Sequence, residues 1–233
     1  MTVLIQKSHY GVFIALGIIF LWFTHLFYIM EHIEVSLTNP WFYLHFLLQT
    51  YLYTGLFITG HDAMHGTVSS NKKVNDLLGY FSVSLFACMP YKKLLENHWA
   101  HHHNPGTEKD PDFCIHSKNF WIWWFHFMAR YITWYQIILI SLLFNFIFWL
   151  GDYSLISLIC LWILPAFLST LQLFYYGTYL PHKHPHTHDM GPHRARTQKK
   201  NHVWAMISCY FFGYHEEHHA STSTPWWQLY KMK

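Results

Sequence analysis

Charged residues are scarce in this sequence. Lys, Arg, Asp and Glu make up 12% of the chain, whereas soluble domains usually carry about 25%. Hydrophobic residues make up 52% and aromatic residues 21%. So few charges cannot cover the surface of a soluble domain this rich in apolar side chains, so the composition indicates a membrane protein. The net charge is only +3, and nothing in the sequence predicts a nucleic-acid partner.

Paired cysteines and nucleotide-binding motifs are missing as well. The four cysteines, Cys88, Cys114, Cys160 and Cys209, are far apart and form no CxxC pair. This spacing argues against both a disulfide framework and a zinc ribbon. No GxGxxG run occurs, so the chain carries no signature of a bound dinucleotide that could supply electrons.

Long apolar runs are abundant instead. A helix needs about 20 apolar residues to cross the core of a bilayer. Four segments meet this requirement, and we expect four transmembrane helices at residues 10–30, 41–60, 131–150 and 154–176. Pro165 lies inside the last segment and predicts a kink. No repeat or low-complexity linker divides the chain, so we expect one all-α domain over residues 1–233.

Two shorter apolar segments are expected to meet membrane lipid without crossing it. Residues 77–90 are too few to span the bilayer, which predicts a re-entrant or interfacial segment. Residues 120–128 are rich in Trp and Phe, which favour the level of the lipid headgroups.

The positive charges are distributed on one side of these spans. The links 31–40 and 151–153 contain no Lys or Arg, and all 15 Lys and Arg lie in the N-terminal segment, in 61–130 or after 180. Two helical hairpins would place these three regions on one face, and the positive-inside rule makes that face cytoplasmic. The sequence therefore predicts a multi-pass integral membrane protein with a cytoplasmic cap.

Histidine is unusually frequent, with 21 residues against 12 Asp plus Glu. Clusters occur in HDAMH (61–65), HWAHH (98–102), PHKHPHTH (181–188) and HEEHH (215–219), all on the predicted cytoplasmic face. Within three of them the histidines are three or four residues apart, which places their rings on one face of a helix. The candidate ligands in these three boxes are His61, His65, His98, His101, His102, His215, His218 and His219.

Eight imidazoles are more than one metal ion can use, so the pattern predicts two ions. Zinc takes four ligands, often thiolates, and no cysteine lies within the boxes. Calcium and magnesium prefer oxygen ligands. An imidazole-rich site with open positions favours iron, with copper, zinc and nickel as alternatives. We therefore expect a histidine-rich di-iron centre in the cap that uses O2.

Other interpretations of these boxes leave residues without a role. HEEHH matches the HExxH pattern of zinc proteases through His215, Glu216 and His219, but such a site needs only one further ligand. Soluble di-iron bundles share the ExxH pair but take carboxylates from all four helices. A zinc-binding membrane protein is the remaining non-enzymatic alternative. A transporter would place polar residues near the middle of its spans, whereas these clusters lie outside them.

The order and spacing of the boxes also resemble a known family. HxxxH, HxxHH and a second HxxHH on apolar spans resemble the membrane di-iron desaturases and hydroxylases. Within them, the chain is similar to the short-type β-carotene ketolases of cyanobacteria and proteobacteria. Five runs carry this resemblance, in order and over nearly the whole chain: HDAMHGT (61–67), PGTEKDPDF (105–113), FYYGTYLPHK (174–183), YHEEHH (214–219) and PWWQLY (225–230).

The resemblance implies an enzyme that oxidises the C4 methylene of a β-ionone ring to a ketone, converting β-carotene to echinenone and then canthaxanthin. It implies two Fe(2+), O2 as co-substrate, a carotenoid substrate taken from the bilayer, and an external redox protein such as reduced ferredoxin. The close alternatives are a carotenoid ring hydroxylase and a fatty-acyl desaturase, which would use the same kind of site.

The resemblance also adds one ligand. It assigns His182, in the LPH run, as a ninth ligand, which the residues alone do not distinguish from His184, His186 or His188. His103 is left out, because Asn104 follows it where related ketolases often carry a basic residue or His. Metal-bound imidazoles usually donate their second nitrogen to a carboxylate or carbonyl. The candidate carboxylates are Asp62, Asp110, Asp112, Glu216 and Glu217.

Overall fold

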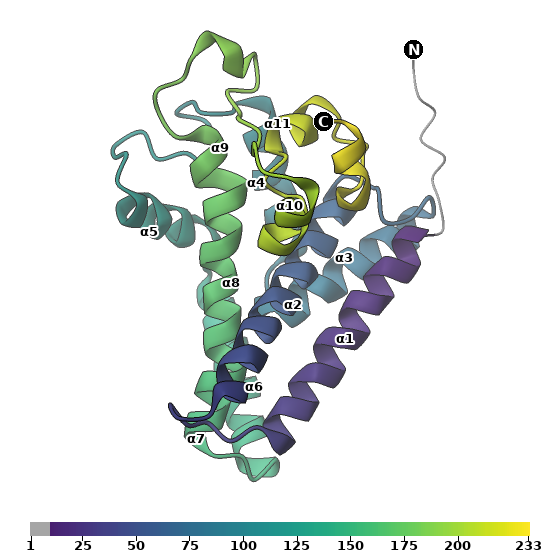
Figure 1. Cartoon of the computed structure of the whole chain (residues 1–233), viewed down its shortest axis with the longest axis vertical. Helices are drawn as coiled ribbons and strands as arrows, with labels where there is room; N and C mark the ends of the chain where they lie inside the picture. Colours follow the sequence, from purple (N-terminus) through teal and green to yellow (C-terminus); the bar gives the residue numbers. More distant parts are fainter. Residues whose placement is uncertain (1–9) are drawn as a thin grey trace.

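The computed structural model describes residues 10–233, apart from the side chain at position 189, and these residues contain helices but no β-strand. Figure 1 shows long helices that converge at one end of the molecule and a cap of shorter helices and loops at the other. The main helices are α1 (Tyr10–His32), α2 (Pro40–Met64), α3 (Lys72–Ala87), α4 (Tyr91–His103), α5 (Phe120–Tyr131), α6 (Trp134–Leu150), α8 (Leu164–Phe174), α10 (His202–Cys209) and α11 (His215–Ala220). The short elements are α7 (Leu155–Ser157), η1 (Leu158–Ile163), η2 (Tyr175–Tyr179), α9 (Leu180–His182), η3 (His188–Met190) and η4 (Trp226–Lys231).

Two helices in the described chain are long and apolar enough to cross a membrane, Tyr10–His32 and the continuous helix Leu155–His182. The pair α5 and α6 is a third candidate, bent by 85° at the break between the two helices. The prediction of an all-helical membrane protein is confirmed. Four spans and a cytoplasmic cap stay predictions, and Lys7, one of the cations used to orient the chain, lies outside the described residues.

Helix α2 occupies the centre of the bundle and packs against α1, α3 and α8. Almost all of its second half is buried, and a cluster that includes Trp22, Tyr53, Leu56 and Tyr210 surrounds it. Because this helix is enclosed by others, some of its polar side chains pair with groups on neighbouring helices. The hydroxyl of Thr54, for example, donates to the side-chain oxygen of Gln172 at 2.5 Å. The buried helix carries the first histidine box from the bundle into the cap.

The chain turns sharply between α5 and α6. Thr133 caps α6: its hydroxyl accepts from the backbone N–H of Gln136 at 3.2 Å, and the Gln136 side chain accepts from the Thr133 N–H at 2.9 Å. The helix predicted from residue 131 therefore begins at Trp134, and Tyr131 ends α5 instead. Helix α5 lies across the long axis in Figure 1 and exposes Trp121, as expected of an interfacial helix.

The helix Leu155–His182 contains two prolines and remains continuous. A π-helical turn precedes each of them: Leu158–Ile163 before Pro165, and Tyr175–Tyr179 before Pro181. Proline cannot donate a backbone hydrogen bond and crowds the carbonyl four residues earlier, and a wider π turn relieves both problems. The helix thus continues past Pro165, where a kink was predicted, and delivers His182 to the cap.

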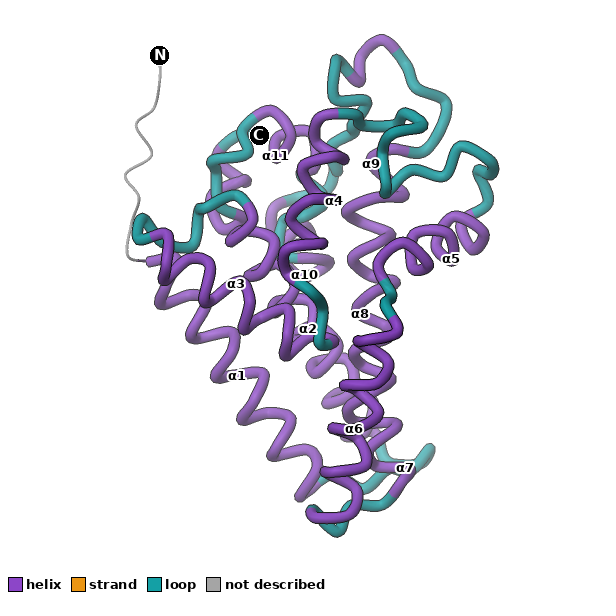
Figure 2. Tube along the Cα trace, turned by 180° about the vertical axis from the view of Figure 1, so that it is seen from behind, coloured by secondary structure: helices purple, strands orange, loops and turns teal. Residues whose placement is uncertain are grey.

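Helices α3 and α4 follow one another beside α2. Asn71 begins α3 by accepting from the backbone N–H groups of Lys73 and Val74, and Cys88 ends it in a left-handed conformation. Residues 77–90, for which we expected a re-entrant or interfacial segment, form the end of α3 and the turn into α4, and α3 lies along α2. Figure 2 shows α4 extending from the middle of the bundle into the cap, where it carries the second histidine box.

Candidate metal centre

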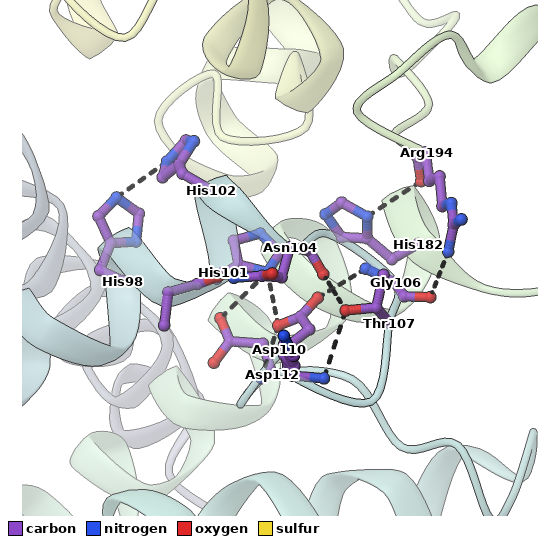
Figure 3. A network of polar contacts seen from close by, with 12 residues as sticks. His98, His101, His102, Asn104, Gly106, Thr107, Asp110, Asp112, His182 and Arg194 are labelled. Carbon is purple, nitrogen blue, oxygen red and sulfur yellow. Dashed lines mark hydrogen bonds and ion pairs between the residues drawn. The ribbon is translucent and has the colours of Figure 1, made fainter.

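All nine histidines proposed as ligands lie together in the cap, although they come from four distant segments. The end of α2 supplies two, the last two turns of α4 supply three, α9 supplies one and α11 supplies three. Seven of the nine are buried, and His65 and His102 are half-buried. Figure 3 shows part of this region with the carboxylates and backbone groups that surround it.

The first cluster consists of His61, His65, His98 and His218, whose candidate ligand atoms lie within 4.8 Å of one another. His61, in the last turn of α2, and His65, the residue that caps its C-terminus, are one helical turn apart, as the HDAMH spacing predicted. The Nε2 atoms of His65 and His98 are 2.6 Å apart. The cluster thus draws on all three sequence boxes, with one histidine from HEEHH, one from HWAHH and two from HDAMH.

The second cluster consists of His101, His182, His215 and His219, again within 4.8 Å. The Nε2 of His219 lies 3.1 Å from the Nε2 of His101 and 3.1 Å from that of His215. The ring of His182 lies 4.8 Å from that of His101, centre to centre. Histidines that share a face of α4 or α11 are therefore divided between the two clusters.

His102 lies between the two clusters. Its Nε2 is 3.1 Å from the Nε2 of His98 and 3.1 Å from that of His218, both in the first cluster. Its ring centre is also 4.2 Å from that of His219 in the second. His102 is therefore close enough to contribute a ligand atom to an ion in either cluster.

The arrangement of ring nitrogens fits metal ions better than a hydrogen-bond network. One proton on an Nε2 cannot satisfy two Nε2 neighbours, yet His102 and His219 each have two. Ligand nitrogens around one ion are roughly 3 Å apart, because each metal–nitrogen bond is about 2.0–2.1 Å. In addition, the Nε2 atoms of His61 and His182 are buried without a hydrogen-bond partner. An ion in each cluster would satisfy these atoms.

Burial keeps most of these imidazoles in the neutral form that binds metals. It lowers the pKa of His65 to about 4 and takes the pKa values of His98 and His218 well below the usual range, where neighbouring imidazoles lower them further. The pKa values of His215 and His219 are depressed for the same two reasons. Their lone pairs are therefore available at neutral pH.

His101 is the exception, because two carboxylates face it. Its Nδ1 donates to Asp110 Oδ1 at 2.9 Å and lies 3.9 Å from Asp112 Oδ2. Burial alone would lower the pKa of His101, but these carboxylates outweigh it and raise the pKa to about 9. Asp110 also accepts from the backbone N–H groups of Gly106 and Asp112, so it both shapes the DPD turn and orients the ring of His101. Figure 3 shows these contacts.

His182 is held by a backbone carbonyl. Its Nδ1 donates to the carbonyl oxygen of Arg194 at 3.0 Å, which leaves Nε2 to face the second cluster. The guanidinium of Arg194 in turn donates to the carbonyl of Gly106 at 2.8 Å, as Figure 3 shows. The loop that supports His182 is therefore tied to the turn that supports His101.

The other histidines near the site lie outside both clusters. His103 is exposed and stacks on Trp99. His186 donates through Nε2 to the carbonyl of His182, and His184 and His188 are exposed. Of the histidines in segment 181–188, only His182 lies in a cluster of the described residues. The resemblance implied the same choice.

A large apolar cavity opens beside the histidines. Its volume is about 540 Å³, and His61, His98, His101 and His215 line one end of it. Along the helix Leu155–His182 its wall runs from Thr178 back to Trp162, a distance of about 24 Å at 1.5 Å per residue. A second cavity of about 160 Å³ shares Trp162 and continues to Leu158.

Comparison with known proteins agrees with this geometry. The family model for fatty acid desaturases matches residues 38–134 and 125–233. The chain belongs to the fatty acid desaturase family. A zeaxanthin 4-ketolase of Chlamydomonas reinhardtii is 38% identical over 91% of this chain and 49% of its own length. Beta-carotene 4-ketolase 3 of Haematococcus lacustris is 39% identical over 79% of this chain and 59% of its own length.

A bacterial relative is matched over more of its length. A beta-carotene ketolase of Paracoccus sp. strain N81106 is 35% identical over 79% of this chain and 76% of its own length. The chain spans only about half the length of the algal relatives. No solved structure matches it. The resemblance to β-carotene ketolases within the desaturase family is confirmed.

Sequence reasoning missed one group that supports the site, and two of the carboxylates that it named have other contacts. The Arg194 carbonyl could not be found from a side-chain pattern, because any residue supplies a carbonyl. Asp62, a predicted carboxylate, lies 3.6 Å from His61 Nδ1 but accepts a hydrogen bond from the backbone N–H of Trp226 at 3.0 Å. Glu217 accepts from Thr197 at 2.8 Å and, like Glu216, is absent from the metal-binding groups of the described residues.

Proposed function

We propose that the chain is a β-carotene 4-ketolase, which oxidises the C4 methylene of β-ionone rings with O2 to give echinenone and then canthaxanthin. The observation that carries this proposal is the long apolar cavity whose end is lined by histidines of both clusters. An extended polyene has the shape of this cavity, and its terminal ring would reach the metal end. The ketolase relatives support the same reaction.

The proposed cofactor is a pair of Fe(2+) ions. His61, His65, His98 and His218 would hold one ion, His101, His182, His215 and His219 the other, and His102 would complete the set. When bound, the iron pair would supply the activation of O2 and the removal of hydrogen from C4. Asp110 would fix the ring of His101 in the orientation that presents Nε2 to the ion.

The remaining work belongs to the cavity. Its apolar walls, which include Trp22, Phe86 and Leu173, would keep water away from the reacting carbon and hold the polyene in line. The first oxidation inserts oxygen at C4 to give an alcohol. A second oxidation at the same carbon gives a diol that loses water to form the ketone. Each round consumes one O2, two electrons and two protons, and an external carrier such as reduced ferredoxin would deliver the electrons.

We further propose a membrane arrangement for this single domain of residues 1–233. Segments 10–30, 41–60, 131–150 and 154–176 would cross the bilayer, and the histidine-rich cap would lie on the cytoplasmic face. The buried polar residues of α2 are compatible with a span, because the surrounding helices shield them from lipid. Carotenoid would enter from the bilayer, and the electron carrier would approach from the cytoplasm.

Pigment analysis tests the reaction directly. The chain is expressed in a bacterium that makes β-carotene, and the extracted pigments are separated by chromatography. We expect echinenone and canthaxanthin, and we expect His98→Ala to abolish both while His188→Ala, at an exposed histidine outside the clusters, does not. Unchanged β-carotene from protein that has reached the membrane would contradict the proposal.

Metal analysis of the purified protein separates the alternatives. Two irons per chain with hydroxylated carotenoid or desaturated lipid as product would favour a ring hydroxylase or a fatty-acyl desaturase on the same site. Zinc without oxidised product would favour a zinc-binding membrane protein.

A further inference from the structure

Two of the nine clustered histidines lie closer to the protein surface than the rest. His65 and His102 are half-buried, whereas the other seven are buried. His65 belongs to the first cluster, and His102 lies between the clusters. The metal centre is therefore nearest to solvent where these two rings meet.

One tryptophan covers both of these rings. The ring of Trp99 lies 5.3 Å from that of His65 and 5.8 Å from that of His102, centre to centre. Trp99 is itself half-buried, and on its other side it stacks on the exposed ring of His103 at 5.7 Å with an interplanar angle of 29°. A single aromatic layer thus separates the ligand rings from a residue at the surface.

Trp99 and His103 also share one face of α4, because they are four residues apart. We call this face the Trp99–His103 surface. The cap as a whole carries more exposed cations than exposed anions, while the exposed charged residues on this face of α4 are Lys92 and Glu96. Among the exposed charged residues that the structure describes in 61–130 and 183–233, the anions are Glu96 and Glu108. The cations are Lys72, Lys73, Lys92, Lys109, Lys118, Arg130, Arg194, Lys199, Lys200, Lys231 and Lys233.

We propose that the Trp99–His103 surface is the docking site of a small, acidic, one-electron carrier protein, and that electrons enter the metal centre there through Trp99, His65 and His102. This inference rests on the proposed function, since it assigns the partner of that same site. Two factors favour the location: the half-buried rings of His65 and His102 bring the clustered histidines close to solvent there, and the excess of exposed cations in the cap attracts an acidic partner. Each carrier gives up one electron and is oxidised, and two deliveries supply one round of oxidation.

The test varies one exposed position and keeps the ligands intact. Iron-loaded protein in lipid nanodiscs is titrated with oxidised plant-type ferredoxin at low ionic strength, and reduction of the centre by reduced ferredoxin is followed without oxygen. We expect His103→Glu to weaken binding and slow the second-order reduction by about tenfold, and His103→Lys to change both in the opposite direction. A folding defect could not produce effects of opposite sign. Added salt screens these charges, so the affinities and reduction rates of the original protein and the two variants should become similar.

His188 provides the matched control, because it is also exposed in the cap but lies outside the clusters. His188→Glu and His188→Lys should leave both measurements unchanged, and dithionite, a small reductant, should reduce every variant at the same rate. Equal effects at both positions, or none at His103, would overturn the proposed location. The reduction assay contains no carotenoid, so its result does not depend on ketone formation. If ferredoxin reduces the centre at this surface but the protein makes no ketone from β-carotene, only the proposed function is contradicted.

Discussion

The two histidine clusters differ in how their imidazoles are held. In the second cluster, His101 donates to the buried carboxylate of Asp110 and His182 donates to the carbonyl of Arg194, while the Nδ1 atoms of His215 and His219 are buried without a partner. In the first, His65 Nδ1 is buried without a partner. His61 Nδ1 lies 3.6 Å from Asp62, too far for a strong hydrogen bond.

The difference indicates a division of roles between the clusters. Outer partners fix ring orientation and make the ligand more basic, so the second cluster should hold its ion more tightly. The first cluster, with His65 half-buried, lies nearer to solvent and is less constrained. A tightly held ion and a more accessible one would then share His102.

Removal of one ligand from each cluster tests this comparison with the largest effect. His182→Ala should empty the second cluster, and His218→Ala should empty the first, leaving about one iron per chain in either variant. Ketone formation should fall by more than about 100-fold in both, since loss of an outer partner alone costs 10–100-fold. Metal analysis and pigment chromatography measure the two effects. Two irons retained in either variant would show that the ligands are divided differently.

Asp110→Asn should weaken the second ion specifically. The substitution keeps the shape of the side chain but removes the negative charge beside His101, and we expect a loss of about 10–100-fold in affinity for that ion. A metal titration measures it. Asp62→Asn is the matched control and should have a smaller effect, because Asp62 hydrogen-bonds a backbone N–H of Trp226. A larger loss from Asp62→Asn would reverse the comparison.

Gly177→Ala should affect both clusters together. A Cβ at this position would lie 2.0 Å from the ring of Phe212, and that ring contacts His61 of the first cluster and His215 of the second. Overpacking of this kind costs about 1–3 kcal/mol, which thermal unfolding would detect. Gly17→Ala, on the same reasoning, should not destabilise the protein, because nothing lies within 4 Å of the added carbon. A metal titration of Gly177→Ala should show weaker binding at both clusters. Weaker binding at only one cluster would argue against a shared support.

Arg194→Ala should have the smallest effect, confined to the second cluster. It removes the hydrogen bond from the guanidinium to Gly106 and leaves the carbonyl that holds His182 in place. The loss should be about 1 kcal/mol, or roughly fivefold in affinity for the second ion. A calorimetric titration resolves this difference. An effect equal to that of Asp110→Asn would mean that the side chain of Arg194 does more than connect two loops.

The spacing within each histidine box predicted that its rings lie on one face of a helix, and the structure shows these rings gathered in the cap. The division between clusters could not be predicted in this way. His101 and His102 are adjacent in sequence, yet His101 lies in the second cluster and His102 between the two. The sharp turn before Trp134 was missed for a similar reason: residues 131–150 are apolar throughout, and the hydropathy pattern does not register a capping box.

By itself, the sequence determined that the protein is helical, associated with a membrane and rich in imidazoles at helical spacing. These properties depend on composition and on neighbours within one or two turns. The tertiary structure decided which histidines face one another, that His182 points into the second cluster with Arg194 behind it, and that the cavity ends at both clusters. Such relations depend on how segments more than 100 residues apart pack together, and local periodicity carries no information about that packing.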